Sequence, residues 1–200
     1  MPLAGNRCRR CGGPAAEPDG ECLTCLSAPP PQQATVIWGE YDGTLRRALL
    51  ALKHHGHDEL ARRLGQRLSS RVASSGLADG VDTVTAVPSH SIHRLRRGWS
   101  AAELLAREVA RELELPFARL LRRHGTGRQA GRTRVQRRAL DRRSFAARRV
   151  PRSRSVLLVD DVITTGTTLR RAVQALLAGG ATTVACAALS LAPDPRRLLA

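Results

Sequence analysis

Apolar residues recur along this chain at a spacing of three to four positions in four separate segments, which is the spacing of amphipathic helices. The first predicted helix spans 43–53 and ends near a Gly-containing His-rich run. Pro116 ends the third helix, and two consecutive glycines at 179–180 end the fourth. The apolar faces of the four helices are Leu45, Leu49 and Leu52; Leu60, Leu64, Leu68 and Val72; Ala102, Leu105, Val109 and Leu113; and Leu169, Val173, Leu176 and Leu177.

Between these helices lie short apolar segments that predict strands, over 36–41, 81–87, 155–159 and 182–189. The segment 155–159 is continuously apolar, as expected of a strand that is covered on both faces. Strands that alternate with helices favour a parallel sheet. We therefore predict an α/β fold, a parallel sheet flanked by helices.

Two parts of the chain differ in composition from the rest. Residues 1–34 contain four of the five cysteines and end in a Pro-rich stretch at 28–31. We predict a small segment and linker over 1–34 and a larger domain over 35–200. The stretch 119–154 is rich in arginine and has Asp141 as its only acidic residue, so we expect a loop or hood there.

The formal net charge is +16, and Lys53 is the only lysine. Guanidinium groups form bidentate pairs with phosphate, so this surface suits polyanions such as nucleic acid or phosphorylated metabolites. A GC-rich genome also enriches arginine and alanine. We expect no signal peptide, and the apolar run 184–192 is too short to span a bilayer. We expect a cytoplasmic protein without membrane insertion.

The segment VLLVDDVITTGTT at 156–168 contains the most specific chemistry. Asp160 and Asp161 follow the buried strand, and ligands bind at the carboxyl ends of strands in open α/β sheets. The next turn enters a helix, whose free N–H groups and positive dipole suit a phosphate. Two carboxylates beside it suit a vicinal diol, Mg²⁺ or both. An acidic helix cap is the structural alternative, and a Walker A loop is excluded because no Gly-Lys-Ser/Thr follows.

These residues resemble the phosphoribosyl diphosphate (PRPP) signature of type I phosphoribosyltransferases. The resemblance implies that Asp160 and Asp161 contact the ribose hydroxyls. It also implies that the turn holds the 5-phosphate, through Thr164, Thr165, Gly166, Thr167 and Thr168.

A second strand end supplies candidates for the pyrophosphate group. In this fold class the turn after the corresponding strand usually binds pyrophosphate, which implies a role for Ser89 and His90 here. Arg94 and Arg97 would neutralise its charge, and Lys53 is a further candidate contact. A solvated basic segment is the alternative. The candidates for a general base are weak: His90, His93 and His124.

Cys8-x-x-Cys11 and Cys22-x-x-Cys25 are ten residues apart. Two such pairs complete a tetrahedral four-thiolate site, so we predict structural Zn²⁺, with a redox dithiol or an iron–sulfur site as alternatives. Metal binding would stabilise a segment too short and polar to fold by burial. Cys186 is expected to be a small core residue.

The order of these blocks resembles the ComF family, phosphoribosyltransferase-like proteins with an N-terminal zinc hook that are linked to DNA uptake. Many members read Val-Pro-Val-Pro and Arg-Gly-Phe-Asn-Gln, where this chain has residues 87–90 as Val-Pro-Ser-His and 97–101 as Arg-Gly-Trp-Ser-Ala. The resemblance implies a PRPP-dependent phosphoribosyltransferase with Mg²⁺ and an unknown acceptor. A PRPP-sensing or single-stranded-DNA-binding accessory protein, without turnover, is the second hypothesis.

Overall fold

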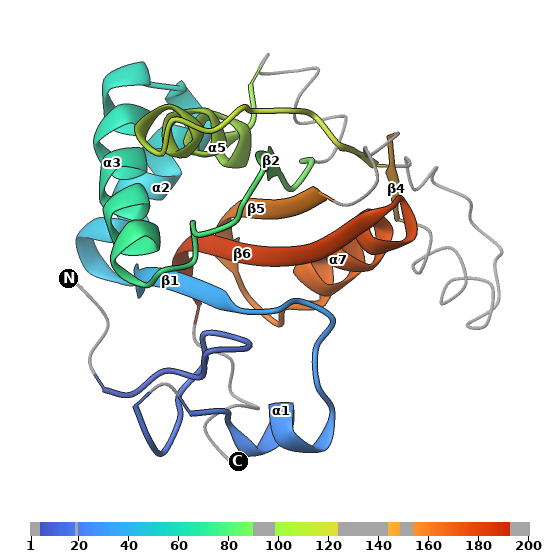
Figure 1. Ribbon diagram of the computed structural model, residues 1–200. Coiled ribbons are helices and arrows are strands. Elements are labelled where there is room, and N and C mark those ends of the chain that lie inside the picture. Colours follow the sequence, from blue (N-terminus) through green and yellow to red (C-terminus); the bar gives the residue numbers. More distant parts are fainter. Residues whose placement is uncertain (1–4, 19, 90–98, 124–143, 149–153, 193–200) are drawn as a thin grey trace, which may run out of the picture.

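The computed structural model describes residues 5–18, 20–89, 99–123, 144–148 and 154–192. A four-stranded sheet with the order β1-β6-β5-β2 forms its centre, and every pairing in it is parallel (Figure 1). The predicted α/β architecture is therefore confirmed. The elements of this layer structure are β1 (Thr35–Glu40), α2 (Gly43–His55), α3 (Asp58–Ser74), β2 (Thr83–Ala86), α5 (Ala101–Glu112), β5 (Arg154–Ile163), α7 (Thr167–Ala178) and β6 (Ala181–Leu191).

Two apolar cores lie on opposite faces of the sheet, and β5 contributes to both. Val156 and Leu158 pack with α7, whereas Leu157 and Val159 pack with α2, α3 and α5. Figure 1 shows these two groups of helices on either side of the sheet. All four side chains are fully buried, which explains why this strand has no polar alternation. Burial of each leucine contributes about 1.5–3 kcal/mol, so the strand that carries the two aspartates is firmly held.

The strand β5 is longer than predicted, because it does not end at the first aspartate. Its pairing with β6 continues through Asp160 opposite Ala188 as far as Ile163 opposite Leu191. The prediction that the strand ends at 159 was wrong because a polar side chain interrupts the apolar pattern but not the backbone ladder. The two acids therefore lie on hydrogen-bonded strand rather than on a free loop.

Part of the arginine-rich stretch, for which the sequence left a loop or a hood open, forms two short strands. The strands β3 (Leu121–Arg123) and β4 (Phe145–Ala147) form an antiparallel pair. Leu121 and Phe145 are buried and join the core that contains α7. Strands of three residues are too short to show a period, so the pattern of apolar residues could not reveal them. Residues 124–143 and 149–153 lie outside the described part of the chain.

The N-terminal segment docks directly on the edge of the sheet. Thr35, the first residue of β1, donates its N–H to the Arg9 carbonyl at 2.7 Å and its hydroxyl to the Arg10 carbonyl at 2.6 Å. Gly12 has φ +71°, and a Cβ there would lie 2.4 Å from Ile37 Cγ1, so this contact requires glycine. A short helix that the sequence did not predict, α1 (Leu23–Ser27), completes the segment.

Candidate functional site

The turn between β5 and α7 has the geometry of an anion site. Gly166 is the N-cap of α7 and has φ +74°, a conformation that favours glycine. The N-cap Gly166 offers no side chain and Thr167 donates its N–H to the Thr165 hydroxyl oxygen at 3.4 Å, so the first turn of α7 presents the N–H groups after Thr167 to a ligand. Thr165 and Thr167 share a hydrogen bond of 3.0 Å between their hydroxyls, which fixes the turn.

A cavity of about 390 Å³ lies against one side of this turn. Thr164, Gly166 and Thr168 line it, whereas Thr165 and Thr167 line a separate groove beside the cysteine segment. The five predicted phosphate contacts are thus brought to one turn, but their side chains divide between two surfaces. We call the first space the ribose cavity. Its described lining residues are Lys53, Val87, Pro88, Ser89, Trp99, Ser100, Ala101, Ala102, Arg123, Asp160, Asp161, Val162, Ile163, Thr164, Gly166, Thr168 and Leu169.

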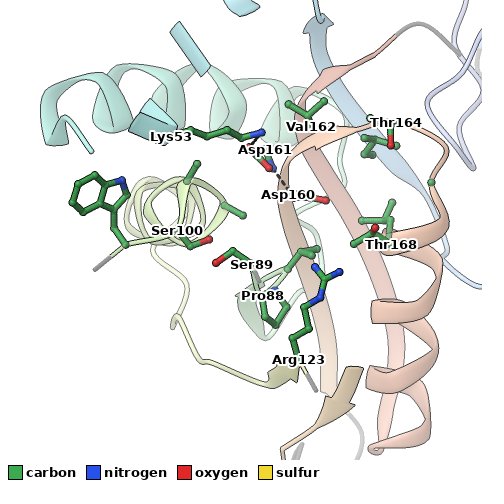
Figure 2. Close-up of a pocket in the computed structure, with 17 residues that line it drawn as sticks. Lys53, Pro88, Ser89, Ser100, Arg123, Asp160, Asp161, Val162, Thr164 and Thr168 are labelled. Carbon is green, nitrogen blue, oxygen red and sulfur yellow. Dashed lines mark hydrogen bonds and ion pairs between the residues drawn. The ribbon is translucent and has the colours of Figure 1, made fainter. Parts of the chain in front are cut away.

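Both aspartates line the ribose cavity (Figure 2). Asp160 is only 8% exposed, and its Oδ1 accepts the Asp161 backbone N–H at 2.9 Å. Burial, reinforced by the negative charge of Asp161, raises the pKa of Asp160 well above its ordinary value. One member of the pair therefore resists ionisation until a ligand or cation compensates its charge.

Lys53 reaches the same acids from α2, and its Nζ lies 2.7 Å from Asp161 Oδ2 (Figure 2). Burial alone would lower the pKa of Lys53, but the ion pair with Asp161 and the nearby Tyr41 and Asp160 raise it. The ammonium is therefore charged at neutral pH. Its partner in this structure is a carboxylate, and its predicted contact with phosphate stays a prediction.

The wall opposite the acids is formed by the residues after β2. Ser89 lies in the ribose cavity, and its Oγ is buried without a hydrogen-bond partner among the described residues (Figure 2). A buried hydroxyl without a partner is costly, so a ligand that accepts its hydrogen bond would be stabilised there. The other predicted pyrophosphate contacts, His90, Arg94 and Arg97, lie outside the described residues, as do His93 and His124.

Sequence reasoning missed two residues of the cavity, Arg123 and Trp99. Arg123 extends from β3 into the cavity (Figure 2), and its guanidinium lies 5.2 Å from the Phe145 ring centre. No periodicity distinguishes it from its many arginine neighbours. Trp99 donates Nε1–H to the Leu52 carbonyl at 3.3 Å and packs on Gly56, where a Cβ would lie 2.4 Å from the indole. The glycine at position 56, in the His-rich run, was the one sequence feature that could have pointed to this contact. In the structure it has φ +61°, a conformation that favours glycine.

The four clustered cysteines form a candidate metal centre. Their sulfur atoms all lie within 4.8 Å of one another, and Cys11 and Cys22 Sγ are 3.8 Å apart. Four thiolates about 2.3 Å from a tetrahedral zinc would be about 3.8 Å apart, so the arrangement fits a metal such as zinc. None of the five cysteines forms a disulfide. Burial raises the pKa of Cys11 to about 11, which a bound cation would reverse. Cys186 is fully buried in β6, away from this cluster.

Among the residues that the structure describes, we find no helix whose length and apolar content would let it cross a bilayer.

The chain is similar in sequence to several known proteins. The family model for the phosphoribosyl transferase domain matches residues 95–198. The solved glutamine PRPP amidotransferase from B. subtilis is 27% identical, with a TM-score of 0.48 over 64% of this chain and 25% of that chain. DNA utilization protein YhgH of Salmonella typhimurium is 31% identical over 182 residues, which cover 88% of this chain and 80% of that protein. Competence protein F of Haemophilus influenzae is 28% identical over 176 residues, 81% of this chain and 74% of that protein. The family match and these relatives show that the chain belongs to the ComF family and has the type I phosphoribosyltransferase fold.

Proposed function

We propose that this protein binds PRPP in the ribose cavity and transfers its phosphoribosyl group to an acceptor, with release of pyrophosphate. One observation carries the proposal: a single cavity combines a helix N-terminus without an N-cap side chain, two strand-borne carboxylates and a buried serine hydroxyl without a partner. Each of these three features matches a different part of PRPP. The match to the phosphoribosyl transferase domain supports the same ligand.

The 5-phosphate would bind where the N–H groups after Thr167 in the first turn of α7 meet the hydroxyls of Thr164 and Thr168. The carboxylates of Asp160 and Asp161 would accept hydrogen bonds from the 2- and 3-hydroxyls of the ribose. Lys53 orients Asp161 through its ion pair, so this acid is preorganised before the ligand arrives.

The pyrophosphate end would face Ser89, whose Oγ–H is available as a donor, and the guanidinium of Arg123. Donors held in place stabilise charge that develops on a leaving group. The hard carboxylate oxygens of Asp160 and Asp161 also fit Mg²⁺, which when bound with PRPP would offset charge on the departing pyrophosphate.

The test measures PRPP affinity and PRPP-dependent pyrophosphate release with Mg²⁺ and a panel of nucleobases. Asp160→Asn and Asp161→Asn keep the shape of each side chain and should each lower PRPP affinity more than tenfold. Asp58→Asn, an exposed acid on α3 outside the cavity, is the matched control and should leave affinity unchanged. Wild-type affinity in both cavity variants would refute the proposal.

A second function, binding of PRPP or single-stranded DNA without turnover, is favoured by one observation. No histidine is among the described residues that line the ribose cavity, so the usual general base is not part of that described lining. The names DNA utilization protein and Competence protein F, given to two relatives, and the net charge of +16 agree with a nucleic-acid partner. Fluorescence anisotropy with labelled single-stranded DNA at two salt concentrations tests it, since phosphate contacts weaken steeply with salt. No binding at low salt would exclude DNA binding.

We also propose that the cysteine centre holds one structural Zn²⁺. A closed four-thiolate site leaves no position for a substrate. The site shares its groove with Thr165, Thr167 and Arg170, so the metal would support the turn that faces the ribose cavity. Metal analysis of the purified protein should give one zinc per chain, and a fully folded metal-free protein would contradict the assignment.

A further inference from the structure

Trp99 connects two walls of the ribose cavity. It is one of the described residues that line this space, and it directly precedes Ser100, the N-cap of α5. Its indole contacts the end of α2, the helix that carries Lys53. The chain has one other tryptophan, Trp38 on β1, which is not among the lining residues. Trp99 therefore joins the start of one helix to the end of another at the site itself.

Two contacts hold the last turn of α2 against this indole. The Nε1–H of Trp99 donates to the Leu52 carbonyl at 3.3 Å, and the same carbonyl accepts the Gly56 N–H at 3.1 Å. The ring also lies directly against Gly56, because a Cβ there would lie 2.4–2.8 Å from three indole carbons. Gly56 has φ +61° and ends the helix. The indole therefore contacts the helix end through both its donor group and its ring.

Lys53 leaves α2 within this same turn. It follows Leu52 directly and lies three residues before Gly56. Its Nζ reaches β5 and lies 2.7 Å from Asp161 Oδ2 (Figure 2). A lysine has a flexible four-carbon stem, and ordering its ammonium costs conformational entropy. The position of the backbone from which the stem starts therefore decides how readily the ammonium reaches the carboxylate.

The pair of Lys53 and Asp161 is sensitive to a shift of the helix end. Coulomb attraction falls as the charges separate, and water between them raises the effective dielectric constant. Helix ends fray, because their last carbonyl groups lack partners within the regular helix. Trp99 gives one of these carbonyls, that of Leu52, a side-chain donor. Loss of the indole would therefore let Lys53 spend more time away from Asp161.

We infer that Trp99 is a positioning residue, which anchors the last turn of α2 so that the Lys53 ammonium stays on Asp161. The coupling between Trp99 and Lys53 requires no ligand. Its consequence for the ligand rests on the proposed function, in which Asp161 accepts a hydrogen bond from a ribose hydroxyl. In this role Trp99 acts on PRPP only through Lys53.

Lys53 is the only lysine of the chain, which allows a direct test without ligand. Acetic anhydride acylates amines, and an ion-paired amine must leave its carboxylate in order to react. Peptide mass spectrometry should show Lys53 acylated at least threefold faster in Trp99→Leu than in the wild type, since local opening exposes it. Trp99→Phe keeps a ring on Gly56 and should lie between the two. Trp38→Leu is the matched control, because it removes a partly buried tryptophan that packs on the same core as Leu52, and should leave the rate unchanged.

PRPP affinity then separates positioning from direct contact with the ligand. Trp99→Leu alone should bind PRPP about fivefold more weakly than the wild type. In the Lys53→Met background the same replacement should cause less than about a twofold further loss, because the ammonium through which it acts is absent. Trp38→Leu should keep wild-type affinity.

An unchanged acylation rate in Trp99→Leu, or an equal rise in Trp38→Leu, would overturn the inference. Equal fold losses of PRPP affinity with and without Lys53 would also overturn it, because Trp99 would then contact the ligand itself. Failure of the wild type to bind PRPP would refute the proposed function instead, and the acylation rates would still decide whether Trp99 and Lys53 are coupled.

Discussion

Replacing Lys53 by methionine removes the cation that holds Asp161 while keeping most of the apolar length of the side chain. The two charges are 2.7 Å apart, and the side chains are 36% and 14% exposed. At an effective dielectric constant of about 20, the gross attraction at this distance is about 6 kcal/mol. Desolvation and side-chain ordering offset most of this attraction, and water screens the charge of the partly exposed lysine. We therefore expect a net loss of about 1–2 kcal/mol, between the values for surface and buried pairs.

For a chain of this length that loss corresponds to a decrease in Tm of about 2–8 °C, which calorimetry measures directly. The effect of the Lys53 variant should be constant between pH 6 and 9. A group whose folded pKa is raised stabilises the protein below its unfolded pKa, about 10.4 for lysine, and this contribution disappears only as pH rises through the folded value. PRPP affinity should fall about tenfold, because an anionic ligand would then meet Asp161 without its cation.

Lys53→Arg is the matched control, since it keeps the charge and should recover most of the stability. Unchanged stability of Lys53→Met at low salt would refute the view that this pair organises the acids. Higher PRPP affinity in that variant would refute it too, because the ammonium would then compete with the ligand for Asp161.

Three further predictions concern other parts of the molecule. Burial raises the pKa of Asp160. The contribution of this carboxyl group to stability is therefore complete below its unfolded pKa of about 4 and is lost as pH rises through its folded pKa. Urea unfolding should show that Asp160→Asn is about 0.5–2 kcal/mol more stable than the wild type at pH 7 and equally stable at pH 3. Gly56→Ala should lose about 1–3 kcal/mol, because its Cβ would collide with Trp99, whereas Gly80→Ala, with φ +73° but open space, should lose less; equal losses would contradict the packing argument. Cys22→Ser should lose zinc in metal analysis and lower Tm, and an unchanged zinc content would contradict the four-thiolate site.

The sheet and the helices on its two faces could be predicted from the sequence because their burial is periodic. Residues 156–159 alternate between the two cores, and Leu45, Leu49 and Leu52 fall on one buried stripe of α2. The chain has no such period where the β3–β4 pair forms. The strands there have three residues each, and their pairing joins segments more than twenty residues apart.

The candidate site was only partly visible for a different reason. Asp160, Asp161 and the glycine-containing turn are contiguous, so a motif could identify them. Arg123 enters the ribose cavity from a separate element, and only the tertiary fold places it there. The same limit applies to the division of the threonines: the sequence Thr164 to Thr168 shows five polar positions but not that they line two different surfaces.

Because the threonines of this turn line two surfaces, the turn connects the cysteine segment with the ribose cavity. Thr165 and Thr167 are joined by their hydroxyls and line the groove whose other wall contains Cys11, Cys22 and Cys25. Thr164 and Thr168 sit beside them on the same backbone but face the ribose cavity. A backbone turn cannot change one of its surfaces without changing the other, so loss of metal should alter phosphate affinity as well as stability. The sign of that change separates two roles: a supporting segment would lower affinity when zinc is removed, whereas a segment that restrains the turn would raise it.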